Sequence, residues 1–381
     1  MKQRALIFLT VLAIAGLILS VACAAPAPPG KVAPAPPTEE KTKDEVKPPP
    51  PPEEKPAEQV KPSPPPPPEE KPTKKVEPPP SEEKPSEEIK PEPEELPSFP
   101  LTVVDDLDRK VEIKELPQRI ISLAPSTTEI LFALGLGDKV VGVTQYCDYP
   151  EAAKSKPRVA GYSTPALEKV VSLEPDLILA DAIHEKTVLP ALEKQGLTVI
   201  VMAAKSLNTV LQDITLVGQI MGKSKAAARL VDGLSDRIEA VTAKTRNLTP
   251  EERPKVLHVI WHDPIWTMGS ETFIDDLIQK AGGVNIFADE FKKSRVVSME
   301  AVVDRNPQVI LVSGMGTTQN LIYNSIKSDP RLDRVEAIVK ERIYQLDGDL
   351  VERSGPRIVE GLEQVAKLIH PEIFGTLETA S

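Results

Sequence analysis

The sequence predicts an α/β fold of two similar lobes with parallel-type sheets, joined by one long rigid helix. A 14-residue segment, 167–180, recurs as 299–312, which predicts a repeated structural unit. Between the two copies lies a helical run, 224–246, that no strand interrupts. On either side of this run, strand-like and helix-like segments alternate, as they do in proteins with parallel sheets.

Each copy of the repeat predicts a short amphipathic helix, a proline that ends it and a buried strand. Pro175 and Pro307 stand at matching places, 132 residues apart, and so do Glu168 and Glu300. A glutamate in the first turn stabilises any helix through the helix dipole. The alternative is that the two glutamates mark the two lobes for a partner that contacts both, and the sequence leaves both interpretations open.

Residues 1–22 resemble a secretory signal peptide. Lys2 and Arg4 precede an apolar run from Ala5 to Leu19, which is too short for a membrane-spanning helix. Small residues come directly before Cys23, as they do at the lipidated cysteine of bacterial lipoproteins. We therefore expect an extracytoplasmic protein, anchored to the membrane by lipidated Cys23. Secretion without a lipid is the alternative.

Residues 23–98 are predicted to be the lipidated cysteine followed by a disordered tether. This part of the chain holds most of the 41 prolines, interspersed with Glu and Lys, and its apolar side chains are too sparse to form a core. In the polyproline II conformation, at about 3.1 Å per residue, it could extend to roughly 230 Å. A tail for peptide recognition is the alternative.

The N-terminal lobe is predicted over residues 99–222. Ser126 and Glu129 have the spacing of a capping box, so each is expected to bond a free backbone amide at the start of the first helix. The first repeat copy follows at 167–180. The predicted strands of this lobe are 101–104 and 111–113 (a hairpin), 119–124, 139–144, 157–161 and 197–202, and its predicted helices are 130–134, 185–195 and 207–221.

Residues 223–247 are predicted to be the inter-lobe helix, with Ser224 as its cap. The C-terminal lobe is predicted over residues 254–375, and residues 262–269 within it are predicted to be a loop. Its predicted strands are 256–261 and 342–346, and its predicted helices are 271–280, 319–328 and 356–369, with the second repeat copy between them.

Composition excludes several classes of protein. The formal net charge is −11 and no basic stripe is present, which argues against a nucleic-acid partner. Two distant cysteines fit neither a disulfide framework nor a cysteine zinc site. Four scattered histidines form no nucleophile–base pair or metal cluster, so an enzyme is not expected. A purely structural, wall-tethered protein would explain the proline-rich segment but not the aromatic loops of both lobes.

Several of these features together resemble a known family. They are residues 119–150, the Glu168 and Glu300 repeats, the single central helix and the run 352–357. Together they resemble the helical-backbone class of ABC-importer substrate-binding proteins, which bind cobalamin, siderophores and haem. Within that class the resemblance is closest to cobalamin-binding proteins, and it covers roughly residues 100–373.

The resemblance implies a function and a set of partners. It implies a ligand cleft between the lobes and a monomeric protein that delivers its ligand to a permease dimer. The ligand would be a cobalt corrinoid, carried as cargo with no resident cofactor; a ferric siderophore or haem is the alternative. Glu168 and Glu300 would then each meet basic residues of a permease subunit.

The resemblance also implies ligand contacts at Tyr146, Tyr162 and Trp266, where aromatic rings can cover the apolar face of a corrin. Each of these aromatics could equally be a packed residue at the rim. Asp349 and Arg353 match polar positions that line the same cleft, and an internal salt bridge between them is an equal interpretation.

Three further residues bear on the ligand site. Cobalamin binders can carry an aromatic residue six places before the second-lobe glutamate, whereas this chain has Ser294 there. Cys147 and His184 offer a thiolate and an imidazole that could bind the metal of a chelate. A lone cysteine is more often inert and a lone histidine is more often a hydrogen-bond donor at the rim, so no metal site is predicted, and His258 is expected in the core.

Overall fold

The structure is a computed structural model that describes residues 94–159, 161–314 and 318–377, all of which belong to one unit, 85–381. The predictions for the signal peptide, for Cys23 and for tether residues up to 93 lie outside the described residues. Within the described ranges, no helix is long and apolar enough to cross a membrane.

The N-terminal lobe is built on a parallel sheet in the order β4-β3-β5-β6. An antiparallel hairpin precedes it, as predicted. The strands are β1 (Leu101–Val104), β2 (Lys110–Ile113), β3 (Ile120–Ser122), β4 (Val140–Val143), β5 (Leu177–Asp181) and β6 (Val199–Met202). The helices that connect them are α1 (Pro125–Ala133), α2 (Leu167–Ser172) and α3 (Val188–Lys194).

The C-terminal lobe repeats this topology in its parallel sheet, β10-β7-β12-β13. Its strands are β7 (Lys255–Val259), β10 (Val284–Asn285), β12 (Val309–Val312) and β13 (Ile343–Gln345). If the four strands of each sheet are numbered along the chain, both sheets have the order 2-1-3-4. The repeat copies form α2–β5 and α7 (Met299–Arg305)–β12, and each supplies the third strand of its sheet. The predicted α/β fold of two similar lobes is confirmed.

A small antiparallel sheet in the C-terminal lobe was not predicted. It has the order β11-β9-β8 and consists of β8 (Trp261–His262), β9 (Ile265–Met268) and β11 (Ser294–Val297). The predicted loop 262–269 is therefore wrong. Ile265 and Thr267 alternate with Trp266 and Met268 in burial, the pattern of a half-buried strand, but four residues are too few to identify it by periodicity.

The remaining elements complete the two lobes. The helices are α6 (Phe273–Lys280), α8 (Thr318–Lys327), α9 (Glu336–Val339), α10 (Gly348–Val351), α11 (Ile358–Ile369) and α12 (Pro371–Phe374). Short 3₁₀ turns are η1 (Gly137–Lys139), η2 (Glu151–Ser155), η3 (Ala182–His184), η4 (Pro250–Glu252) and η5 (Pro330–Leu332).

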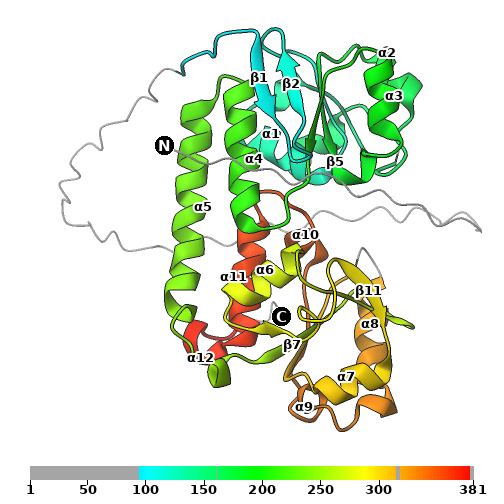
Figure 1. Ribbon diagram of the computed structural model, residues 1–381, viewed down its shortest axis with the longest axis vertical. Helices are drawn as coiled ribbons and strands as arrows, with labels where there is room; N and C mark the ends of the chain where they lie inside the picture. The colour runs from blue at the N-terminus through cyan, green and yellow to red at the C-terminus, as the bar shows by residue number, and fades with distance from the viewer. Residues whose placement is uncertain (1–93, 160, 315–317, 378–381) are drawn as a thin grey trace, which may run out of the picture. The chain divides into compact units, whose positions relative to one another are not determined.

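Two long helices, α4 (Leu207–Ile220) and α5 (Ser224–Thr245), run side by side, and α5 continues from one lobe to the other (Figure 1). Gly218 allows this approach, because a Cβ atom on it would lie 2.3 Å from the Cβ of Ala227. The interior of α5 contains a single glycine, Gly233, and the helix is continuous, as its sequence pattern predicts.

The start of α5 is capped by a residue far away in the sequence. The predicted Ser224 cap is wrong, because Ser224 is the first helical residue and the preceding Lys223 makes no side-chain cap. The carboxylate of Glu94 instead accepts the backbone amides of Lys225 and Ala226, each at 2.9 Å. Glu94, which lies in the segment predicted as tether, is thereby bound to the helix between the lobes.

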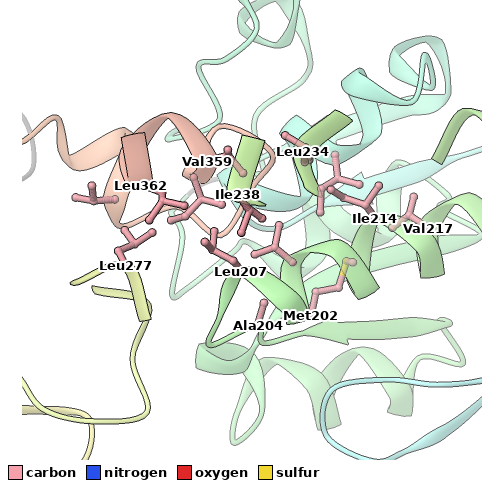
Figure 2. Packing of buried hydrophobic residues seen from close by; sticks show 14 of the residues in the cluster. Met202, Ala204, Leu207, Ile214, Val217, Leu234, Ile238, Leu277, Val359 and Leu362 are labelled. Carbon is pink, nitrogen blue, oxygen red and sulfur yellow. The ribbon is translucent and has the colours of Figure 1, made fainter. Parts of the chain in front are cut away.

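One hydrophobic cluster extends through both lobes (Figure 2). Met202 and Leu207 enter it from the N-terminal lobe, Leu234 from α5, and Leu277 and Leu362 from helices of the C-terminal lobe. Further clusters lie under the outer faces of the two sheets. The lobes are therefore joined by buried apolar contacts as well as by the continuous backbone of α5.

Candidate ligand-binding site

The loop after β4 carries the first predicted contact, Tyr146, which is 47% exposed. The loop is fixed from beneath by Arg158, whose Nη1 donates to the carbonyl oxygens of Thr144 at 2.7 Å and Cys147 at 2.9 Å. Cys147 is fully buried, with its Sγ 3.2 Å from the Thr144 hydroxyl. Cys147 is therefore part of the loop's support, and Tyr146 is one of the residues that the loop exposes.

Tyr162 is held in place by His184. The imidazole Nδ1 accepts the backbone amide of Asp181 at 3.0 Å, so Nε2 carries the hydrogen and donates to the Tyr162 carbonyl at 2.6 Å. His184 is fully buried, its ring meets that of Tyr162 edge to face, and both of its nitrogens are hydrogen-bonded. Burial, and then the Asp181 carboxylate, raise the pKa of Tyr162, so its phenol stays protonated at neutral pH.

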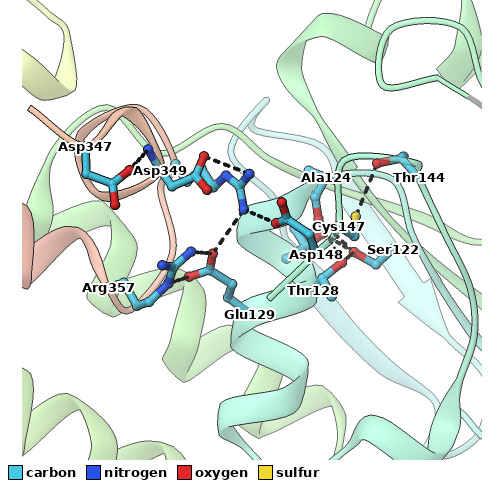
Figure 3. Close-up of polar contacts among 12 residues, drawn as sticks. Ser122, Ala124, Thr128, Glu129, Thr144, Cys147, Asp148, Asp347, Asp349 and Arg357 are labelled. Carbon is cyan, nitrogen blue, oxygen red and sulfur yellow. Dashed lines mark hydrogen bonds and ion pairs between the residues drawn. The ribbon is translucent and has the colours of Figure 1, made fainter. Parts of the chain in front are cut away.

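Asp349 and Arg353, predicted as polar contacts, lie together and form an ion pair, with Arg353 Nη2 2.8 Å from Asp349 Oδ1. Arg353 Nη1 also reaches the opposite lobe, 2.6 Å from Asp148 Oδ1 and 3.8 Å from Glu129 Oε1. Partial burial acts to raise the pKa of Asp148, but the hydrogen bond and the positive charge of Arg353, with smaller contributions from the Asp148 backbone and Arg357, together lower it. The Tyr146 loop is thus tied to the C-terminal lobe through Asp148 (Figure 3).

Glu129 makes a second and more buried link between the lobes. Arg357 binds it in a bidentate manner, Nε to Oε2 at 3.1 Å and Nη2 to Oε1 at 2.6 Å, and Glu129 is only 3% exposed (Figure 3). Burial raises the pKa of Glu129, and the bond from Arg357 opposes that rise. Gly355 permits the approach, since a Cβ atom on it would lie 2.9 Å from Glu129 Oε2.

The predicted capping box of Ser126 and Glu129 is therefore wrong. Helix α1 begins at Pro125 with no side-chain cap, and both residues lie inside the helix. Instead, the hydroxyl groups of Thr127 and Thr128 each donate a hydrogen bond, at 3.0 Å, to the carbonyl oxygen of Ala124, the residue just before the helix. Glu129 is free of a capping role and faces the other lobe.

Three residues at this junction were not singled out from the sequence: Asp148, Tyr149 and Arg357. The guanidinium carbon of Arg357 lies 3.8 Å from the centre of the Tyr149 ring. All three stand inside segments that carried the family resemblance, near residues that were chosen. Their role depends on pairing between distant parts of the chain, for which the sequence offered no spacing signal.

Trp266 lies apart from these residues, on β9 of the small antiparallel sheet, and is 43% exposed. Ser294 is on the neighbouring strand β11, opposite Met268. His258 is buried in β7, as predicted, with Nε2 2.8 Å from the Ser313 hydroxyl, and burial lowers its pKa to about 3. His258 is thus a neutral core residue.

Glu168 and Glu300 are exposed in the first turns of α2 and α7, at matching places in the two lobes. Helix α7 has its own cap, because the Ser298 hydroxyl accepts the amide of Ala301 at 3.2 Å. A bond from its own backbone amide, and then one from Ser298, lower the pKa of Glu300. Both glutamates therefore present carboxylates on the surface.

The described residues include no group of three or more His, Cys, Asp or Glu side chains arranged to hold a metal ion. Two cavities, of about 450 and 480 Å³, open elsewhere on the lobes, and none of the predicted contacts lines them. The chemistry available at the lobe junction is therefore aromatic stacking and charge-assisted hydrogen bonding.

Comparison with known proteins decides the family. The model of the periplasmic binding protein family matches residues 120–350. The chain belongs to this family. Over 284 residues it is 35% identical to the ABC transporter substrate-binding lipoprotein YvrC of Bacillus subtilis, covering 72% of this chain and 87% of that protein. It is 32% identical over 251 residues to the vitamin B12-binding protein of Vibrio vulnificus, covering 66% and 89% of the two chains.

Solved structures of the family have the same fold. The vitamin B12-binding protein BtuF of Vibrio cholerae is 30% identical, with a TM-score of 0.60, and covers 66% of this chain and 96% of its own. The haem-binding protein RhuT of Roseiflexus is 29% identical, with a TM-score of 0.60, and covers 66% and 98%. This member of the periplasmic binding protein family is thus an extracytoplasmic substrate-binding protein of an ABC importer.

Proposed function

We propose that this protein captures a corrinoid between its two lobes and delivers it to an importer permease. The observation that carries the proposal is the pairing of Asp148 with Arg353, which holds the Tyr146 loop beside Asp349 and Arg353 at the lobe junction. Tyr146, Tyr162 and Trp266 supply aromatic faces for the apolar ring, and the charged pair supplies bonds for its amide-bearing edge. Relatives that are named vitamin B12-binding proteins support this choice of ligand.

A ferric siderophore or haem is the second candidate ligand, because structural neighbours include haem-binding proteins. Arg353 offers a guanidinium that can bind carboxylates as well as amides. Equilibrium dialysis against cyanocobalamin, haemin and a ferric hydroxamate distinguishes the candidates. If the protein binds haemin or the hydroxamate but not cyanocobalamin, the proposed ligand is wrong and the family assignment still holds.

The contact set has its own test. Truncation of a buried aromatic contact typically costs about 2 kcal/mol or more, roughly thirtyfold in affinity. Tyr162→Ala and Trp266→Ala should both weaken binding on this scale, whereas Val339→Ala should not. Val339 is a suitable control, because it is exposed and precedes β13, at the sheet edge away from the carboxyl ends. Parent-like binding by both aromatic variants would refute the contact set.

Glu168 and Glu300 are proposed to dock the protein on its permease. Each is an exposed carboxylate at a helix start on its own lobe, so two permease subunits can contact one each through arginine. Glu168→Ala with Glu300→Ala should abolish uptake while ligand affinity stays unchanged. The control double variant, Glu151→Ala with Glu239→Ala, makes the same charge change at two other exposed glutamates. If the Glu168→Ala, Glu300→Ala variant shows normal uptake and only a lower Tm, both residues act only as local helix stabilisers.

We also propose that Cys23 is lipidated and anchors the protein outside the cytoplasm. The motive is the charged start, apolar run and small residues before Cys23, together with YvrC being a lipoprotein. Cys23→Ser should release the protein from membranes on fractionation. If the variant sediments with membranes as the parent does, another anchor is responsible.

A further inference from the structure

The exposed face of the small sheet β11-β9-β8 carries a row of apolar side chains. Trp266 of β9 stands opposite Trp261 of β8 on one side and Val296 of β11 on the other. Opposite residues of antiparallel strands project from the same face of a sheet. Val296, Trp266 and Trp261 therefore form one row across the three strands, here called the tryptophan row.

The row is exposed to an extent that is unusual for large apolar residues. Val296 is 47% exposed, Trp266 43% and Trp261 38%, while Ile265 and Val297, which alternate with them, are buried on the opposite face. Trp261 and Trp266 are the protein's only two tryptophans, so both of its largest aromatic side chains lie on one exposed face. Contiguous apolar patches on soluble proteins mark places where a ligand or partner binds.

Trp261 is fixed in position. Its indole Nε1 donates to the Asp263 carbonyl at 2.9 Å, and its ring centre lies 5.1 Å from that of His262. A ring that is already ordered loses little entropy when it binds a ligand. Neighbouring strands lie about 4.8 Å apart, so the row is about 10 Å wide. That width suits a flat ring system better than a small polar solute.

The row lies at the edge of the lobe where ligands bind in α/β folds. Trp261 comes two residues after β7 ends, at Val259, and therefore stands at the carboxyl end of that parallel strand. Met268, which shares the face of Trp266, packs against the hydrophobic cluster common to both lobes. The face of Trp266 thus continues from this hydrophobic cluster to the row.

We propose that Trp261 and Val296 extend Trp266 into one flat apolar wall, against which the face of a planar macrocycle stacks. The inference rests on the proposed function and assigns two further ligand-binding residues to it. Trp261 is the second stacking ring, and Val296 closes the wall at its other end. Continuity with Trp266 favours a macrocyclic ligand over a second copy of the chain as the occupant of the row.

Equilibrium dialysis of the parent and variants with cyanocobalamin, haemin and a ferric hydroxamate tests this, because it needs no protein fluorescence. Trp261→Ala should lower affinity for the ligand that the parent binds by about tenfold or more, and Val296→Asp should lower it as well. Trp261→Phe should stay within about threefold, since it keeps an aromatic face. Val339→Ala should bind as the parent does, and melting curves confirm that each variant is folded.

A second measurement reports on contact at Trp261 itself. In Trp266→Phe, all tryptophan emission comes from Trp261, so bound ligand should protect the residual emission from acrylamide quenching. In Trp261→Phe, the same protection should be seen for Trp266.

Several outcomes would overturn the proposal. If Trp261→Ala binds like the parent while Trp266→Ala does not, the wall ends at Trp266 and the proposed function stands. If the parent binds none of the three ligands, both proposals fail together. If the parent forms a concentration-dependent dimer that Trp261→Ala abolishes, a second copy of the chain occupies the row.

Discussion

Asp213, on α4, is a buried carboxyl group that shares a site with Asp106, to which it is hydrogen-bonded. Burial, and then the neighbouring Asp106 carboxylate, raise the pKa of Asp213 from 3.8 to about 9. Burial also raises the pKa of Asp106. Two carboxyl groups in contact hold a proton between them at neutral pH, because both cannot ionise at low cost. The pair joins the turn after β1 to helix α4.

This pair predicts how stability depends on pH. Because the pKa of Asp213 is higher in the folded than in the unfolded chain, its stabilising contribution is complete below about pH 4. That contribution is lost as the pH rises through about 9. The slope is at most about 1.4 kcal/mol per pH unit for one proton. Asp213→Asn should reduce the slope of unfolding free energy between pH 5 and pH 9, measured by urea denaturation. The exposed control Asp138→Asn should keep it, and equal slopes in all three proteins would contradict the assignment.

The buried pair between Glu129 and Arg357 predicts a large loss on substitution. Arg357→Gln should lower the unfolding free energy by about 2 kcal/mol or more, because it leaves a buried carboxylate without its main partner. Lys154→Ala, which breaks an exposed pair with Glu151, should change it by less than about 0.5 kcal/mol. The double variant Glu129→Gln with Arg357→Gln should lose less than the sum of the single variants. Additive losses in chemical denaturation would argue against direct pairing.

Single residues also show where prediction from sequence stops. The spacing of Ser126 and Glu129 favoured a cap, since local spacing is what a sequence displays directly. The actual partner of Glu129 lies 228 residues away, and only the folded chain brings the two together. Tyr146, Asp349 and Arg353 were found because their segments resemble a family. Tyr149 lies in the same segment as Tyr146 but was not chosen, and Trp261 lies outside the two segments, 119–150 and 352–357; the exposure of neither can be read from residue type.

At the scale of elements, the cap on α5 gives a matched pair of variants. Glu94→Ala should destabilise the protein by about 1 kcal/mol, because it removes the acceptor of two first-turn amides. Ser224→Ala should have a much smaller effect, because Ser224 is inside the helix and supplies no cap. Thermal melting of the two variants beside the parent decides this. A larger loss from Ser224→Ala would restore the cap expected from sequence.

The longer helices and most parallel strands were predictable because each is a long apolar pattern or a run bounded by glycine or proline. The two-residue parallel strand β10 and the four-residue helices α9, α10 and α12 were missed. The repeat unit was especially clear, since two copies support one interpretation, and both became helix–strand units. Strands β8 and β9 were missed because their two and four residues give no measurable period. Strand β9 is defined by pairing with β11, about thirty residues later, and β8 by pairing with β9.

On the scale of the whole molecule, we predict that the lobes move little when ligand binds. Helix α5 passes between them without a glycine-rich crossover, and the shared hydrophobic cluster and the Glu129–Arg357 pair join them further. Hinge closure needs residues that absorb large backbone rotations, and bending here would also expose buried apolar surface. Solution scattering should give nearly the same radius of gyration with and without ligand. A large decrease on ligand addition would show closure.

Glu94 has a mechanical consequence. It is the first described residue of the chain, and its two bonds attach it to the start of α5 rather than to the adjacent strand β1. Force applied through the preceding residues would therefore act on the start of α5, one face of which is buried, before it reached the β1–β2 hairpin. A pull at this point would have to break the two bonds of Glu94 before it could unzip the short β1–β2 strand pair.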